Sequence, residues 1–201
     1  MRVAETVQTI ERPGQREKIV RATAQLLRQR GYAATGLADI IATSGAPKGS
    51  LYHYFPGGKD EIAVEALRYA SGKVHATLME LGAEQPSAAA VLRRYGVLVA
   101  GWMADSQFRD GCPIATTLLE TAAEKSTTAE AGRLAFASWT GVLRNKLESE
   151  GAASARAESL ARLAIMALEG ALIFARVEGD AAPIIAATED VAAMMERETA
   201  A

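Results

Sequence analysis

The first feature of the sequence that could do chemistry is a short run of hydrogen-bonding side chains, made up of Lys48, Ser50, Tyr52, His53 and Tyr54. Ammonium and hydroxyl groups donate hydrogen bonds to phosphate oxygens, and a lysine can also donate to O6 and N7 of guanine. A small helix that presents such groups outward is suited to the major groove of DNA. The run therefore predicts a DNA contact surface.

The segment from Leu37 to Lys59 predicts the two helices and the turn that position these polar side chains. A short apolar edge predicts one helix, and Gly45 permits the positive φ that a tight turn between two helices requires. Pro47 fixes φ near the start of a second short helix, where a missing N–H costs little. Leu51 and Phe55 share the face that docks on the first helix, so the polar groups face outward.

The rest of the chain predicts an all-α fold of about nine helices. Residues 1–14 are expected to be a flexible arm, residues 15–58 a DNA-binding unit with three small helices, and residues 59–201 a larger helical body. Apolar periodicity and Gly or Pro punctuation predict helices at 15–30, 59–81, 88–104, 113–123, 127–150, 153–177 and 184–197. Helix 59–81 is a long connector between the two parts.

Charge and cysteine content narrow the class of protein. Of the chain's 201 residues, 49% are apolar and only 5% aromatic, which favours packed helices. Residues 1–60 hold nine Lys or Arg against five Asp or Glu, whereas the remainder holds thirteen against nineteen. A basic head on an acidic body suits a nucleic-acid-binding protein, although chance scatter of surface charge is the alternative. A single cysteine and the lack of a long apolar run predict a cytoplasmic protein without an internal disulfide or membrane span.

The strongest family signal lies in residues 19–67, IVRATAQLLRQRGYAATGLADIIATSGAPKGSLYHYFPGGKDEIAVEAL. Together with the long connector and helical body, this segment resembles the TetR/AcrR family of bacterial repressors. Two finer strings, GAPKGSLYHYFPGGK and GCPIATTLLE (Gly111–Glu120), resemble its LmrA/YxaF-like branch. The resemblance implies a homodimer on a near-palindromic double-stranded DNA operator, and a small-molecule effector bound between the connector and the following helices.

The resemblance also assigns roles to the DNA-contacting residues. Lys48 would contact base edges, Gly49 would let the backbone approach DNA, and hydroxyl groups nearby would contact phosphate. The alternatives are a solvated lysine, a neutral glycine, an idle surface histidine and one tyrosine half-buried against the first helix. Gly36 and Ala38 depart from the family pattern, which leaves the second helix as the main reader. The predicted DNA-binding residues are Thr35 (a helix cap or a phosphate contact), Pro47, Lys48, Gly49, Ser50, Tyr52, His53, Tyr54 and Lys59.

Bulky side chains gather between residues 95 and 174, where they favour an adaptable apolar pocket. Ordinary core packing explains most of them, so a subset led by Trp102, Phe136 and Trp139 is expected to face the ligand. The remaining predicted ligand-binding residues are His75, Tyr95, Phe108, Cys112, Thr117 and Phe174. Cys112 precedes a helix start, where a thiolate would be stabilised, but a buried structural thiol is the alternative.

The last two predicted helices carry small apolar faces that the family uses to form a four-helix dimer interface. The predicted interface residues are Leu160, Leu163, Ala164, Ala167, Ala171, Ile184, Val191 and Met195. The alternative, internal packing alone, would leave one of two wide apolar faces uncovered.

These patterns predict a transcriptional repressor that leaves its operator when a small, largely apolar molecule binds. A transcriptional activator or a thiol-sensing regulator of the same fold are the alternatives. A helical-bundle enzyme is disfavoured, because the chain has only two histidines and lacks the spacing of a metal or phosphate-binding motif. Neither a cofactor nor a metal ion is expected.

Overall fold

The computed structural model describes residues 14–123 and 126–200, and within these ranges it contains nine α-helices and no β-strand. The helices are α1 (Gln15–Arg30), α2 (Leu37–Ser44), α3 (Lys48–Tyr54), α4 (Lys59–Glu84), α5 (Ala88–Asp105), α6 (Pro113–Thr121), α7 (Thr127–Ser149), α8 (Ser154–Glu178) and α9 (Ala182–Thr199). The all-α prediction is confirmed, and the predicted helix ends differ by only a few residues. The predicted N-terminal arm, apart from Gly14, lies outside the described residues.

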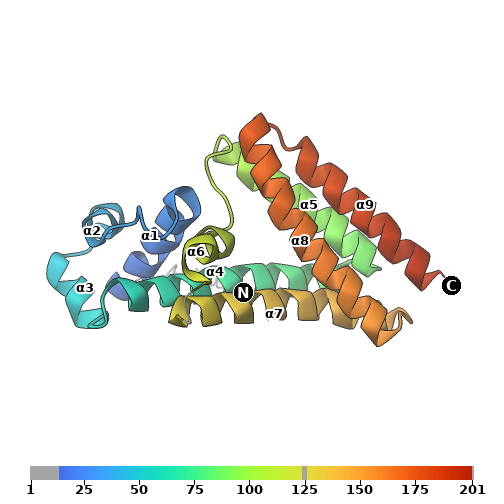
Figure 1. Cartoon of the computed structure of the whole chain (residues 1–201), viewed down its shortest axis with the longest axis horizontal. Helices are drawn as coiled ribbons and strands as arrows, with labels where there is room; N and C mark the ends of the chain where they lie inside the picture. The colour runs from blue at the N-terminus through green and yellow to red at the C-terminus, as the bar shows by residue number, and fades with distance from the viewer. Residues whose placement is uncertain (1–13, 124–125, 201) are drawn as a thin grey trace, which may run out of the picture.

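The two short helices α2 and α3 lie at one end of the molecule, beside α1 (Figure 1). Gly45 ends α2 with a φ of 62°, the left-handed conformation that glycine adopts without strain. Pro47 is the residue immediately before α3 rather than its first helical residue. Leu51 and Phe55 are fully buried with Ile40, which confirms the predicted docking face. The remaining faces of α3 are therefore free to carry polar groups.

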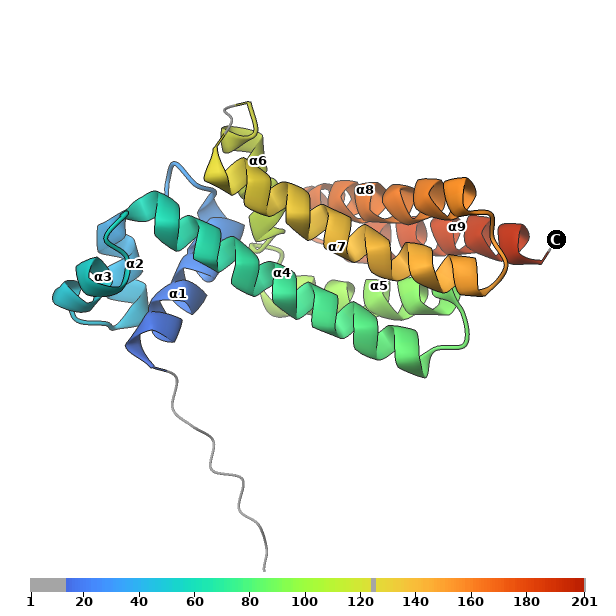
Figure 2. The same cartoon turned by 90° about the horizontal axis from the view of Figure 1, so that it is seen from below.

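Helix α4 connects this head to the body and packs along α7 (Figure 2). At the far end of the molecule, α5 and α8 pack against α9. Helix α6 contacts α1 of the head as well as α4 and α7 of the body. Gly132 permits part of this arrangement, because a Cβ there would lie 2.6 Å from Leu118 Cδ1. Helix α6 is thus placed between the head and the body.

Buried apolar residues form two clusters. The head cluster joins α1, α2, α3 and the start of α4, whereas the body cluster joins α4 to α9 and includes Ala24 and Leu27 of α1. Tyr69 of α4 packs against both clusters. The head is therefore held to the body through α1 and α4. None of the described helices is long and apolar enough to cross a membrane.

Candidate functional site

The outward face of α3 carries the groups that the sequence predicted for DNA contact. Pro47, Lys48, Gly49 and His53 are exposed, and Ser50 is half-buried. Both tyrosines are open to solvent: 51% of Tyr52 and 40% of Tyr54 is exposed. The imidazole of His53 lies edge-on to the ring of Tyr54, with 4.9 Å between centroids. This face therefore presents one cation, one imidazole and two phenols from a single helix.

Two flanking candidates are placed differently from the prediction. Thr35 is buried, and its hydroxyl donates to the carbonyl oxygen of Gly31 at 2.7 Å, so it is neither an exposed phosphate donor nor a helix cap. The residue that precedes α2 is Gly36, whose N–H donates to Asp39 Oδ2. Lys59 is half-buried, with Nζ 4.2 Å from the centroid of the Tyr32 ring. The protein itself therefore accounts for the placement of this cation.

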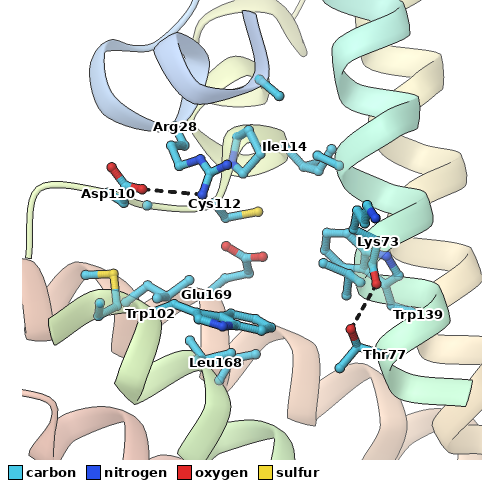
Figure 3. A pocket seen from close by; sticks show the side chains of 18 of the residues that line it. Arg28, Lys73, Thr77, Trp102, Asp110, Cys112, Ile114, Trp139, Leu168 and Glu169 are labelled. Atoms are coloured by element: carbon cyan, nitrogen blue, oxygen red, sulfur yellow. Dashed lines mark hydrogen bonds and ion pairs between the residues drawn. The ribbon is translucent and has the colours of Figure 1, made fainter. Parts of the chain in front are cut away.

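A cavity of about 390 Å³ opens in the body, and residues of α1, α4, α5, α6, α7, α8 and the segment before α6 line it. Its wall is largely apolar and aromatic, which is the usual character of a small-molecule site. Figure 3 shows Trp102 and Glu169 on one side of this space and Lys73 and Trp139 on the other. Four of the predicted ligand-binding residues line it: Tyr95, Trp102, Cys112 and Trp139.

Three aromatic side chains of the cavity wall have defined contacts with other groups of the protein. Trp139 is buried, and its Nε1 donates to the carbonyl oxygen of Ser71 on α4 at 3.1 Å. The ring of Tyr95 lies edge-on to that of Trp102, with 6.1 Å between centroids. Trp102 lines the cavity and remains 48% exposed. The aromatic wall therefore includes one buried and one exposed tryptophan.

One acidic group of the cavity is Glu169, whose residue is half-buried but whose carboxyl is enclosed by protein. Burial raises the pKa of this carboxyl to about 7, and its hydrogen bond with Cys112 lowers the pKa only in part. The pKa of Cys112 lies well above its usual value, first because of burial and then because of the charge of Glu169. Such a thiol is poor in thiolate, which argues against Cys112 as a reactive sensor.

The other predicted ligand-binding residues do not line this cavity. Phe136 lines a second hollow of about 430 Å³ beside α6, α7 and α8. His75 lies outside both, with Nδ1 2.8 Å from Ser138 Oγ on α7, and Thr117 is fully buried in α6. Phe108 packs against the body core, and Phe174 is 62% exposed on α8. A bulky or aromatic side chain in this part of the sequence therefore does not by itself indicate that the residue lines the cavity.

The predicted dimer residues differ in how accessible they are on the single chain. Six of them are used inside the single chain, where α8 and α9 pack on each other and on α5: Leu160, Ala164, Ala171, Ile184, Val191 and Met195 are buried. Leu163 and Ala167 are half-buried. Large apolar side chains are instead exposed on another row of α8: Met166, Ile173, Phe174 and Val177.

Helix α6 carries a set of hydrogen bonds that tie the body to the head. The carboxylate of Glu120 accepts from the backbone N–H groups of Tyr32 at 2.9 Å and Ala33 at 2.6 Å. Thr116 Oγ1 donates to the carbonyl oxygen of Leu27 at 2.8 Å. Four residues before Thr116, Cys112 lines the cavity. One short element therefore contacts both the cavity and the segment between α1 and α2.

Several cavity residues were absent from the sequence predictions, above all Glu169. The available signal was its position: Ile165, Leu168 and Leu172 line the cavity from α8, and Glu169 lies on the same helical face. Arg28 and Asp110 also line the cavity, where they form an ion pair of 3.3 Å. Within the described ranges, no group of three or more His, Cys, Asp or Glu is placed to hold a metal ion.

A short helix pair with an exposed polar face, mounted on a helical body, defines a DNA-binding protein of the helix-turn-helix class. Residues 19–66 match the model of the bacterial regulatory proteins of the tetR family, and residues 88–190 match the C-terminal domain of LmrA/YxaF-like transcriptional regulators. The chain therefore belongs to the TetR family of transcriptional regulators and has an LmrA/YxaF-like C-terminal domain.

Individual relatives agree with this assignment. An HTH-type transcriptional regulator of Mycobacterium tuberculosis is 36% identical over 85% of this chain and 89% of its own length. YxaF of Bacillus subtilis, also an HTH-type transcriptional regulator, is 31% identical over 90% of this chain and 95% of its own. A TetR transcriptional regulator from Legionella pneumophila has the same fold, with a TM-score of 0.80 and 20% identity over 94% of this chain and 98% of that one.

Proposed function

We propose that this TetR-family regulator is a repressor that leaves its operator when a small molecule occupies the cavity of about 390 Å³. The observation that carries the proposal is the position of α6, which lines the cavity near Cys112 and binds the head through Glu120. A ligand that displaces the start of α6 would also displace the segment between α1 and α2. Occupancy of the cavity would thereby change how the head is presented to DNA.

Ligand binding shifts the protein between two states only through different affinities for them. In the state described here, Asp110 lies 3.3 Å from Arg28 Nη1 and accepts from Gln29 Nε2 at 3.0 Å, so the segment before α6 holds the end of α1. Arg176 of α8 donates to the carbonyl oxygen of Gln29 at 3.1 Å. A molecule that binds the cavity more tightly when these contacts to the end of α1 are broken would favour a state in which the head takes a different position relative to the body.

The operator contact is proposed for α3, with Lys48 at base edges and Tyr52, His53 and Tyr54 beside it. Support comes from their exposure on one helix of the helix-turn-helix. Gly49 is exposed, and apart from its chain neighbours and the adjacent backbone of α3 no protein atom lies within 4 Å of a Cβ placed there, so this side of α3 is open for approach to DNA.

A single head reads only part of an operator, so we propose a homodimer on a near-palindromic site. The exposed row of Met166, Ile173, Phe174 and Val177 on α8 is the face proposed for the contact. A patch of this kind on a helix is characteristic of a protein interface. Burying it against a second copy would remove large apolar side chains from water.

The test is binding to the DNA upstream of the protein's own gene, measured by fluorescence anisotropy over a salt series. The expected result is specific binding whose affinity falls steeply, by about 10³-fold or more between 50 and 200 mM salt, as phosphate contacts require. A ligand found by thermal-shift screening should then lower operator affinity and bind less tightly to the DNA-bound protein. Specific binding that no cavity ligand weakens would overturn ligand release, and absent binding would overturn the choice of operator.

A further inference from the structure

The cavity contains a carboxyl group that no basic residue neutralises. Glu169 projects from α8 into the space between Cys112 and Trp102 (Figure 3). Among the described residues, none of the ion pairs involves Glu169, and its hydrogen-bond partner is the neutral thiol of Cys112. An enclosed carboxylate is costly unless a cation or several donors compensate it. The cavity therefore favours an occupant that supplies positive charge.

The basic residues of the cavity wall do not supply that charge. Arg28 is paired with Asp110, and Gln29 donates to the same carboxylate at 3.0 Å. Lys73 is exposed on α4, with Nζ 5.8 Å from the centroid of the Tyr69 ring. An exposed ammonium is screened by water and by salt, so it opposes a second cation only weakly. The enclosed charge of Glu169 thus dominates its end of the cavity.

Aromatic rings form much of the remaining wall of the cavity. The rings of Tyr95 and Trp102 come from α5, that of Tyr69 from α4 and that of Trp139 from α7, and all four line the same cavity. The face of an aromatic ring attracts a cation, and the attraction strengthens when water is excluded. Apart from Thr77, the remaining lining residues, among them Val99, Ile165 and Leu168, are apolar. Together these groups suit a molecule with one positive charge on an apolar body.

We propose that the cavity binds an organic cation, in which a positively charged nitrogen lies beside Glu169 and the apolar body lies among the aromatic rings. This inference rests on the proposed function, because it names the chemical class of the effector for the same cavity. It also refines the expectation of a largely apolar ligand, since the apolar wall contains an enclosed carboxyl group that is outside the ion pairs of the cavity.

The experiment uses three probes that share a naphthalene body: 2-naphthylmethyl-trimethylammonium, 2-naphthylmethanol and 2-naphthoate. Isothermal titration calorimetry of the full chain at pH 8 should show the cation binding at least about tenfold more tightly than the alcohol, with 2-naphthoate weakest. Glu169→Gln should remove most of the preference for the cation and leave the affinity for the alcohol within about twofold. Glu178→Gln, at an exposed position of the same helix, is the matched control.

Equal or tighter binding of the alcohol or of 2-naphthoate would overturn the inference, as would binding of none of the three. Retention of the cation preference in a folded Glu169→Gln variant, checked by circular dichroism, would do the same. Operator release separates this inference from the proposed function. A cation that binds through Glu169 without weakening operator binding contradicts ligand release, whereas release by neutral molecules alone contradicts only the choice of a cation.

Discussion

Glu120 on α6 accepts a hydrogen bond from the backbone N–H of Ala33, with 2.6 Å between the two atoms. The second oxygen of the same carboxylate accepts from the N–H of Tyr32 at 2.9 Å. Ala33 lies between α1 and α2, so this carboxylate binds the segment that leads into the helix-turn-helix formed by α2 and α3. These hydrogen bonds connect the body directly to the head, in addition to the packing of α1 and α4.

Replacing Glu120 with Ala should uncouple the cavity from the head. We expect the free energy of unfolding to fall by about 1 kcal/mol, because two charge-assisted hydrogen bonds at an exposed site are lost. Operator affinity without ligand should change by less than about threefold, whereas the loss of affinity that a ligand causes should shrink. Glu130→Ala, which removes an exposed carboxylate from α7, is the control for charge. An unchanged response to ligand in Glu120→Ala would contradict the proposed role of α6.

Lys48→Ala should weaken operator binding by about tenfold to a hundredfold, the usual effect of losing a contact to base edges. The variant should also discriminate less between bases at one operator position. Measuring its affinity for a set of single-base operator variants would reveal that position. Arg94→Ala removes an exposed cation from α5 and should leave affinity unchanged at matched salt. A uniform loss over all operator variants would instead identify Lys48 as a phosphate contact.

The helices could be predicted from the sequence because their ends carry local signals. Gly31 and Gly179 end α1 and α8 with positive φ, and Pro113 opens α6. Each of these signals acts on the backbone within one helical turn. The ends of such a helix can therefore be predicted without knowing which other helices pack against it.

Neither the exposed apolar row of α8 nor the cavity could be predicted in this way. The periodicity of α8 shows which of its residues are apolar, but not whether α9 or a second chain covers them. Leu160 and Ala164 are buried by packing inside the chain, whereas Phe174 on the same helix is exposed. Glu169 was missed for the same reason, since an acidic residue in an apolar helix is recognised as buried only when the opposite wall is known.

Phe174→Lys should convert a dimer to a monomer without unfolding the chain. The side chain is 62% exposed on the single chain, so a lysine there meets water in the monomer but would be enclosed in the proposed contact. Light scattering coupled to size-exclusion chromatography should show half the wild-type mass, and operator affinity should fall by at least about tenfold. Leu134→Lys, at a 51% exposed position of α7, is the matched control. A dimer that survives Phe174→Lys would show that the interface lies elsewhere.

The enclosed carboxyl of Glu169 should make stability depend on pH in a defined direction. Its pKa rises from 4.5 to about 7 on folding, because burial disfavours the charged form. Between these values the folded chain binds more protons than the unfolded chain, so the free energy of unfolding falls as pH rises. The loss of stability caused by ionising the buried Glu169 is absent below pH 4.5 and complete above about pH 7.

Glu169→Gln removes this titration, so the variant should gain stability over wild type as pH rises from 5 to 8, by on the order of 2 kcal/mol. Urea unfolding at fixed protein concentration measures the difference. Cys112 and Tyr95 face the same carboxyl, and because their own pKa values are raised they remain neutral over this range. Glu178→Gln, which removes an exposed carboxylate from the same helix, is the control for the change of charge. A difference between Glu169→Gln and wild type that stays constant from pH 5 to 8 would mean that Glu169 is already ionised when folded.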